Sequence, residues 1–144
     1  MPAVQQDFQR LPLLAKTRLA LEILGVYARV RWGLRRSELP RLVEDLRRVS
    51  GQPPAILPDG SREGTRLAAA VVRTLEAVPP LDSRCLTRSL VLIDLLARRG
   101  VQGQLVIAVR PQELLALAAH AWVEVDGRAL LEPAGADHAR MVTL

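Results

Sequence analysis

The sequence predicts an α+β fold in which helices precede a small antiparallel sheet. Apolar residues recur at helical spacing up to Gly100, they alternate at strand spacing beyond it, and an Asp-Gly turn joins two of the alternating segments. With 144 residues, 49% of them hydrophobic and 24% charged, the chain can bury one core. We therefore expect a single domain over residues 1–144, with a helical N-terminal part over 1–79 and a helix with the sheet over 80–144.

Two helices are expected in the first 50 residues. The first covers Leu13–Trp32, where apolar residues recur every three or four positions between basic ones. The second has Ser37 as its N-cap and Pro40 in its first turn, and it should end near Ser50.

A loop and a third helix follow. Several prolines and a Pro-Asp-Gly turn signal predict a loop over Gln52–Gly60. Ser61 is the expected N-cap of the third helix, and Pro79 and Pro80 should stop it.

The fourth helix should run from Ser83 to Gly100, with this glycine as its C-cap. At roughly 100° per residue, Cys85 lies about 160° from a narrow polar stripe of the helix. That stripe contains Thr87, Asp94 and Arg98. Since the helix is otherwise apolar nearly all round, we expect it to be the central one, with the thiol facing the interior.

Strand alternation begins after Gly100. Leu105, Ile107 and Val109 form one alternating set, and Ala121, Val123 and Val125 form another. Asp126-Gly127 is the turn after the second set, and two later segments, Leu130-Leu131 and Met141–Thr143, are candidates for further strands. We expect these segments to form one antiparallel sheet on which the fourth helix packs.

Charge and cysteine content limit the function classes. The formal net charge is +5, and nearly all basic residues are arginine, which favours contacts with carboxylates or phosphates. No apolar run reaches the roughly 18 residues of a membrane span, and no secretory signal begins the chain, so we expect a cytoplasmic protein without a membrane partner. One Cys and two His make neither an internal disulfide nor a closed zinc site, and no metal or cofactor is expected.

Cys85 and His120 are the candidate catalytic pair. The first turn of a helix favours a thiolate because its unpaired N–H groups carry partial positive charge, and Arg84 and Arg88 would add to this effect while Asp82 would oppose it. A lone Cys on an apolar helix face can also be a small packing residue. His120 lies among alanines at the entrance to a strand, where it can be either a catalytic base or a core histidine satisfied by a carbonyl.

Hairpin register suggests Glu132 as the carboxylate that orients His120. A three-residue loop of Val125, Asp126 and Gly127 would pair Glu124 with Arg128 and place Glu132 opposite His120. A two-residue Asp126-Gly127 turn would instead place His120 and Glu132 on opposite faces. The proposed Cys85–His120–Glu132 triad therefore depends on the longer loop.

Three segments carry a resemblance to a known family. They are Arg84–Gly100, Leu105–Arg110 and the Ala-His-Ala-Trp-Val-Glu-Val-Asp-Gly stretch of Ala119–Gly127. Over about residues 80–135 the chain resembles the lasso peptide biosynthesis B2 proteins, leader peptidases of the transglutaminase-like, papain-related superfamily. The resemblance implies a transglutaminase-like core with Cys85 as nucleophile, His120 as its histidine and Glu132 at the position of a third residue that is usually Asp.

The same resemblance implies substrate and partners. The substrate would be a ribosomally made precursor peptide, cut between leader and core by a cysteine endopeptidase. A separate B1-type leader-recognition protein would be a partner, and the lasso cyclase is a further candidate. Arg41, Arg47 and Arg48 are hypothesised to dock the leader or its carrier protein.

Two other functions remain open. A transglutaminase-like acyltransferase would use the same triad with an amine in place of water. A basic nucleic-acid-binding module would use the arginine-rich helices, but the aromatic content of 3% offers no stacking platform, so nucleic acid is not expected as a partner.

Overall fold

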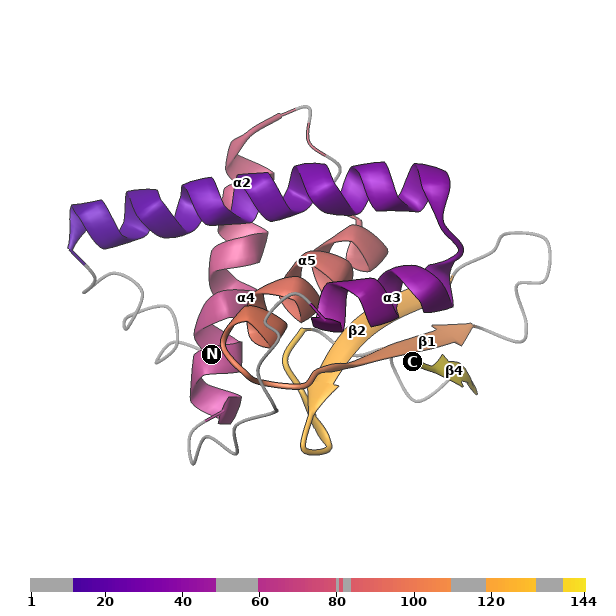
Figure 1. The fold of residues 1–144 in the computed structure, drawn as a ribbon. Coiled ribbons are helices and arrows are strands. Elements are labelled where there is room, and N and C mark those ends of the chain that lie inside the picture. The colour runs from indigo at the N-terminus through magenta and orange to yellow at the C-terminus, as the bar shows by residue number, and fades with distance from the viewer. Residues whose placement is uncertain (1–11, 49–59, 80, 82–83, 110–118, 132–138) are drawn as a thin grey trace.

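The computed structural model describes residues 12–48, 60–79, 81, 84–109, 119–131 and 139–144 (Figure 1). Helices come first along the chain and strands second, which confirms the predicted α+β order. The helices are α2 (Leu13–Arg36), α3 (Leu39–Arg47), α4 (Gly60–Ala77) and α5 (Cys85–Arg98). The strands are β1 (Gln104–Val109), β2 (Ala119–Val125), β3 (Arg128–Ala129) and β4 (Ala139–Thr143).

The sheet has the strand order β3-β2-β1-β4, and its neighbouring strands are antiparallel. Leu105 pairs with Val123 and faces the helices together with it, because both belong to the main core. Val106 pairs with Trp122, and these two belong to a second cluster with Ala108. The alternation read from the sequence therefore separates a helix-facing side of the sheet from a side that carries Trp122.

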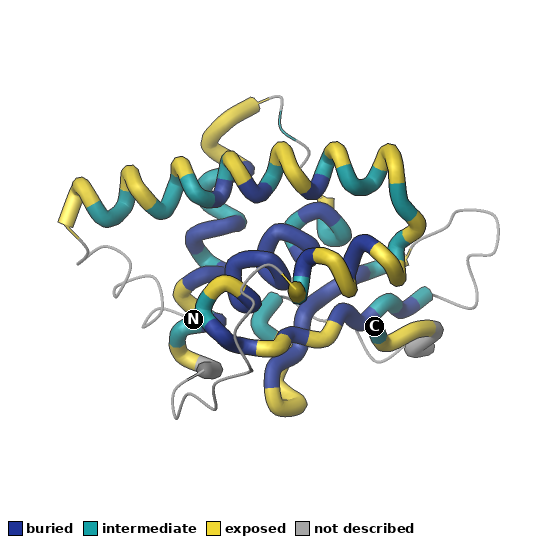
Figure 2. The backbone as a smooth tube through the Cα atoms, viewed as in Figure 1, coloured by how far each residue is buried: buried dark blue, intermediate teal, exposed yellow. Residues whose placement is uncertain are grey.

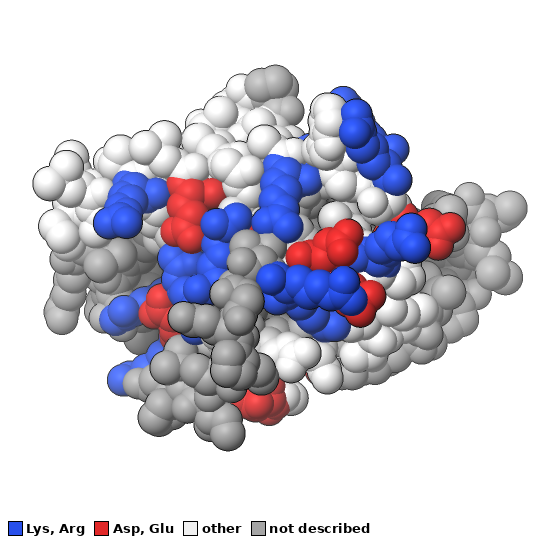
Figure 3. All heavy atoms as spheres, viewed as in Figure 1, with Lys and Arg blue, Asp and Glu red and all other residues white. Residues whose placement is uncertain are grey.

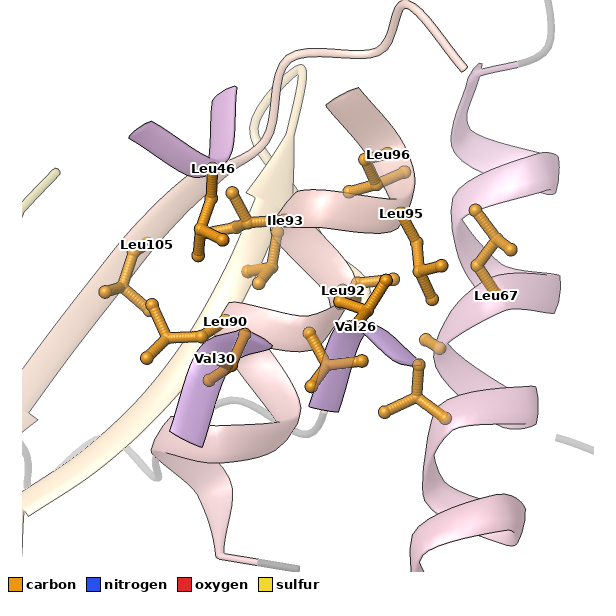
Figure 4. Close-up of a cluster of buried hydrophobic side chains, with 14 of the residues drawn as sticks. Val26, Val30, Leu46, Leu67, Leu90, Leu92, Ile93, Leu95, Leu96 and Leu105 are labelled. Atoms are coloured by element: carbon orange, nitrogen blue, oxygen red, sulfur yellow. The ribbon is translucent and has the colours of Figure 1, made fainter. Parts of the chain in front are cut away.

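Helix α5 is the central element, as its apolar circumference predicts. It contacts α2, α3 and α4 as well as β1 and β2, and Figure 2 shows it as an almost continuous buried stretch inside the molecule. Leucines and valines from four elements meet on it in Figure 4. Of the predicted polar stripe, Thr87 and Asp94 are buried and Arg98 is exposed, so only part of the stripe faces water.

Two of the predicted helix caps are wrong. The backbone N–H of Ser37 donates to Gly33 O at 2.9 Å, so Ser37 closes α2 and Glu38 is the N-cap of α3. Helix α4 already begins at Gly60, which places Ser61 inside it. Apart from Gly60, the predicted loop of residues 52–60 lies outside the described residues.

The C-terminus of α5 follows the prediction. Gly100 has a φ of 74°, a left-handed conformation that glycine adopts without steric cost. Its N–H donates to Ala97 O at 3.0 Å, and the N–H of Val101 donates to Leu96 O at 2.9 Å. This pair of bonds is a Schellman motif, which ends the helix and turns the chain towards β1.

The hairpin between β2 and β3 corrects the predicted register. Val125 pairs with Arg128 and Glu124 pairs with Ala129, so the loop has two residues rather than three. Asp126 and Gly127 have φ angles of 50° and 75°, as a type I′ turn requires. Asp-Gly is a preferred sequence for that turn, and its twist matches that of the strands, which explains why the shorter loop forms.

The strand predicted at Leu130-Leu131 lies two residues earlier, as β3 at Arg128–Ala129. Strand β3 ends at Ala129, and the chain bends at Leu130 and Leu131. The N–H of Leu130 still donates to Val123 O at 2.9 Å, and its side chain packs on the main core. Among the described helices none has the length and apolar character of a membrane span, although α2 has 24 residues.

Candidate active site

Cys85 is the first residue of α5 and lies half-buried against the main core. Its Sγ is 4.0 Å from the carbonyl oxygen of Ala119, the first residue of β2. The Cys85 carbonyl accepts a 2.7 Å hydrogen bond from Ser89 Oγ, which fixes the first turn of the helix. The predicted inward orientation of the thiol is therefore confirmed, and the sulfur lies where the central helix meets the start of β2.

His120 is the second residue of β2 and pairs with Ala108 of β1. It is half-buried, and its ring stacks on that of Trp122 with 6.0 Å between centroids and an interplanar angle of 29°. Residues two apart in a strand share a face, so the imidazole and the indole lie on the side of the sheet that carries the second apolar cluster.

Glu124 extends this row by one more position. Trp122 Nε1 donates to Glu124 Oε1 at 3.0 Å, and both side chains are buried. His120, Trp122 and Glu124 thus form a continuous row, in which a buried carboxylate holds the indole against which the imidazole stacks. The alternation of His-Ala-Trp-Val-Glu predicts that these side chains share one face, but it does not predict the bond between Trp122 and Glu124.

The structure brings Cys85 and His120 to the same end of β2. The sulfur contacts the backbone of Ala119, and His120 is the next residue along the strand. The ring of His120 packs on Trp122, on the sheet face that carries the second apolar cluster, whereas Ala121 belongs to the main core beneath the helices. The thiol therefore reaches the start of β2 from α5 on the main-core side, whereas the imidazole lies one residue along the strand on the face of the second cluster.

Glu132 lies outside the described residues. The three-residue hairpin that placed it opposite His120 is wrong, because Glu124 pairs with Ala129 rather than Arg128. Since β3 ends at Ala129, the observed register does not extend to residue 132. The role of Glu132 as orienting carboxylate stays a prediction.

Arginine side chains near the thiol are only partly available to it. Arg84 is exposed at the N-cap of α5. Arg88, one turn into the helix, makes a 2.7 Å ion pair with Glu76 of α4, so part of its charge is neutralised by a carboxylate. Asp82, expected to oppose the thiolate, lies outside the described residues.

Two of the three arginines assigned to leader docking, Arg47 and Arg48, have structural partners. Arg47 donates to the carbonyl oxygens of Gly103 and Leu144, and Arg48 makes a 2.7 Å ion pair with Glu44 on its own helix. Burial lowers the pKa of the Arg47 guanidinium, and the nearby Glu44 carboxylate offsets this only in part. Arg47 therefore joins elements of the fold, which disfavours it as a docking residue.

Comparison with protein families identifies the superfamily of the chain. A family model described as the transglutaminase-like superfamily matches residues 24–143. The chain belongs to the transglutaminase-like superfamily. The match includes Cys85, His120 and Glu132, and it begins within α2. The family therefore extends over most of the N-terminal helical part and not only the segment from residue 80 onwards.

Members of the transglutaminase-like superfamily include cysteine proteases and acyltransferases. No curated protein and no solved structure gives a significant match to this chain. Within the residues that the structure describes, no group of three or more His, Cys, Asp or Glu side chains could hold a metal ion. The candidate site therefore consists of the Cys85 thiol, the His120 imidazole and the Trp122 and Glu124 side chains that follow His120 on the same face of β2.

Proposed function

We propose that this chain is a cysteine endopeptidase that removes the leader from a ribosomally made lasso peptide precursor. One observation carries the proposal. The single thiol of the chain lies at the start of the central helix, 4.0 Å from the carbonyl of Ala119, the residue directly before His120. A nucleophile at a helix N-terminus with a histidine on the adjoining strand is an arrangement suited to acyl transfer.

The reaction would proceed through an acyl-enzyme. The Cys85 thiolate attacks the carbonyl carbon of the leader–core peptide bond, and the C–N bond then breaks. His120, protonated as the partner of the thiolate, gives its proton to the leaving amine of the core peptide. Water, deprotonated by the same imidazole, then hydrolyses the thioester, releases the leader carboxylate and restores the thiolate.

The Trp122–Glu124 pair would restrict the imidazole during these steps. Stacking on a buried indole limits the rotation of the His120 ring, and the 3.0 Å bond to Glu124 limits that of the indole. Only the resemblance now supports Glu132 as the carboxylate that accepts the second N–H of the imidazole, because the hairpin register that placed it opposite His120 does not form. A cytoplasmic setting, a B1-type leader-recognition partner and contact with the lasso cyclase belong to the same proposal.

The decisive experiment is cleavage of the neighbouring precursor peptide with and without the leader-binding partner. Cys85→Ala should remove cleavage while the far-UV circular dichroism spectrum stays unchanged. Arg128→Ala, an exposed change on β3, is the matched control and should keep full activity. Cleavage by Cys85→Ala at the rate of the unchanged protein would exclude the peptidase proposal.

Substitutions of the other two residues separate their roles. His120→Asn should lower kcat by about a thousandfold or more, because it removes the proton carrier. Glu132→Gln should have a smaller effect if the carboxylate only orients the ring. Equal rates for the His120→Asn variant and the unchanged protein would remove His120 from the mechanism.

Acyl transfer to an amine is the other activity that the superfamily includes. Mass spectrometry of the products distinguishes the two reactions when a primary amine is added. Hydrolysis gives a leader with a free carboxylate, whereas transfer gives an amide that carries the mass of the added amine. We expect the carboxylate.

A further inference from the structure

Helix α2 exposes a row of apolar and small residues along one side. Leu14 is 86% exposed, Leu21 is 64% exposed and Trp32 is 58% exposed. Gly25 and Ala28 are exposed between them. We call these five residues the α2 seam: Leu14, Leu21, Gly25, Ala28 and Trp32.

The α2 seam is not the side that α2 presents to the core. Ile23, Val26 and Val30 are the buried residues of the helix. At roughly 100° per residue all members of the seam lie within about 40° of Leu14, whereas Ile23 and Val30 lie about 160° to 180° away. From Leu14 to Trp32 the seam is about 27 Å long at 1.5 Å per residue. One helix thus carries two apolar sides, and in the part of the chain that the structure describes its buried residues lie on one of them.

Spacing in the α2 seam matches a helix–helix contact. Leu14, Leu21 and Ala28 follow one another at intervals of seven, as do Gly25 and Trp32, and the two sets alternate as positions d and a of a heptad. A Cβ added at Gly25 would meet no atom within 4 Å. The small residues between large ones therefore leave recesses that side chains of a second helix can fill.

Charge along α2 is strongly positive. The helix contains six basic residues and one acidic residue, Glu22, which gives a formal charge of +5. This equals the net charge of the whole chain, so the other residues carry as many acidic as basic groups. Figure 3 shows basic side chains along the length of α2.

Arginines border the α2 seam directly. Arg18, Arg35 and Arg36 are exposed and lie within about 60° of Leu14 around the helix. The guanidinium of Arg36 lies 3.8 Å from the centre of the Trp32 ring, so the seam ends in a cation–π pair.

We propose that the α2 seam binds an acidic amphipathic helix of a partner protein. Heptad spacing provides the apolar contact, and the bordering arginines favour carboxylates on the incoming helix. A second copy of this chain is disfavoured because two helices of charge +5 would repel each other. The inference is independent of the proposed peptidase activity, since none of its residues belongs to the site at Cys85.

A designed peptide can test the proposal without knowledge of the natural partner. The probe is a synthetic peptide of three heptads with Leu at positions a and d and Glu at positions e and g. Its control has Lys in place of every Glu. Isothermal titration calorimetry should show at least tenfold tighter binding of the acidic peptide, and binding should weaken as salt increases. Equal affinity for both peptides would overturn the proposal.

Protein variants locate the binding surface. Leu21→Ser removes the apolar contact, and Leu21→Glu also reverses the local charge preference. Each variant should bind the acidic peptide at least tenfold more weakly than the unchanged protein does. Circular dichroism should show an unchanged fold because Leu21 is exposed. Val78→Glu, at an exposed apolar residue outside α2, is the matched control and should bind like the unchanged protein. Unaltered binding by both Leu21 variants would refute the seam as the site.

Other occupants are measured in parallel. Sedimentation velocity detects self-association, vesicles of phosphatidylglycerol and phosphatidylcholine detect lipid binding, and a duplex DNA detects nucleic-acid binding. If one of these depends on Leu21 and the acidic peptide does not bind, the seam belongs to that occupant and the proposal is wrong. If all three are insensitive to Leu21→Ser while peptide binding is sensitive, the proposal is supported.

Discussion

Arg47 Nη2 lies 2.7 Å from the carbonyl oxygen of Gly103, and the same nitrogen lies 2.6 Å from that of Leu144. One guanidinium of α3 thereby joins the residue before β1 to the residue after β4. Leu144 is also paired with Leu105 through two backbone hydrogen bonds, of 2.7 and 2.8 Å. Arg47 thus fastens a helix to the point where two neighbouring strands meet.

Replacing Arg47 by Ala should therefore lower the free energy of unfolding. Two half-buried carbonyls lose charged donors, and we expect a loss of about 2 kcal/mol. Urea unfolding followed by circular dichroism measures it. Arg48→Ala is the control, because the pair that Arg48 makes with Glu44 is exposed and such pairs contribute about 0.5 kcal/mol or less. Similar losses for the two variants would contradict the structural role of Arg47.

Replacement of Gly103 and of Gly25 by alanine should change the free energy of unfolding in opposite directions. A Cβ at Gly103 would lie 2.9 Å from Val123 Cγ1 and 3.1 Å from Leu96 Cδ1, so we expect a loss of about 1 to 3 kcal/mol from overpacking. Gly25 lies inside α2 with open space around it, and alanine there should add about 0.5 to 1 kcal/mol. In thermal and urea unfolding, the midpoint of Gly103→Ala should be lower than that of the unchanged protein, and the midpoint of Gly25→Ala should be higher.

Asp94 is fully buried in α5 between two arginines. Arg98 Nε donates to its Oδ1, and Arg29 Nη1 of α2 lies 3.4 Å from Oδ2. Asp94→Asn keeps the shape but removes the charge, leaving two guanidiniums without a common counter-charge. Because both arginines remain partly in water, we expect a loss of about 2 kcal/mol.

A surface carboxylate provides the comparison for Asp94. Glu44→Gln, at an exposed pair, should change the free energy of unfolding by less than about 0.5 kcal/mol. An Asp94→Asn variant as stable as Glu44→Gln would show that the buried carboxylate does not stabilise the contact between α2 and α5.

Trp122→Phe tests the row behind the imidazole. Phenylalanine keeps an aromatic ring but loses the Nε1–H that donates to Glu124, so a buried carboxylate oxygen loses a donor and the free energy of unfolding should fall by about 1.5 to 3 kcal/mol. If the row restricts His120, the NMR signals of its ring should also change position. Trp32→Phe, at the exposed tryptophan of α2, should change neither measurement.

Elements of the fold were predictable where the pattern is local. The periodicity of α2 and α5, the left-handed Gly100 and the alternation of β1 and β2 all depend on neighbours within a few residues. The N-cap predictions for Ser37 and Ser61 are wrong because a cap depends on where the backbone leaves the helix. That point is set by packing between helices rather than by the serine itself.

Prediction of the site was less complete. The sequence pattern predicts a helix start near Cys85 and a strand start near His120, and the structure places both residues at the same end of β2. The predicted hairpin register is wrong. It aligns His120 with Glu132 through a three-residue loop, whereas the Asp-Gly sequence favours a two-residue turn. The partners of Arg47 and Asp94 come from distant segments, so no local pattern could reveal them.

The single thiol has a practical consequence. Because Cys85 is the sole cysteine among 144 residues and is half-buried, an alkylating reagent such as iodoacetamide has one cysteine position to modify. Intact-mass measurement would give the fraction of chains whose Cys85 has reacted with the reagent. The pH dependence of the alkylation rate would then report the ionisation of this sulfur without any knowledge of the substrate.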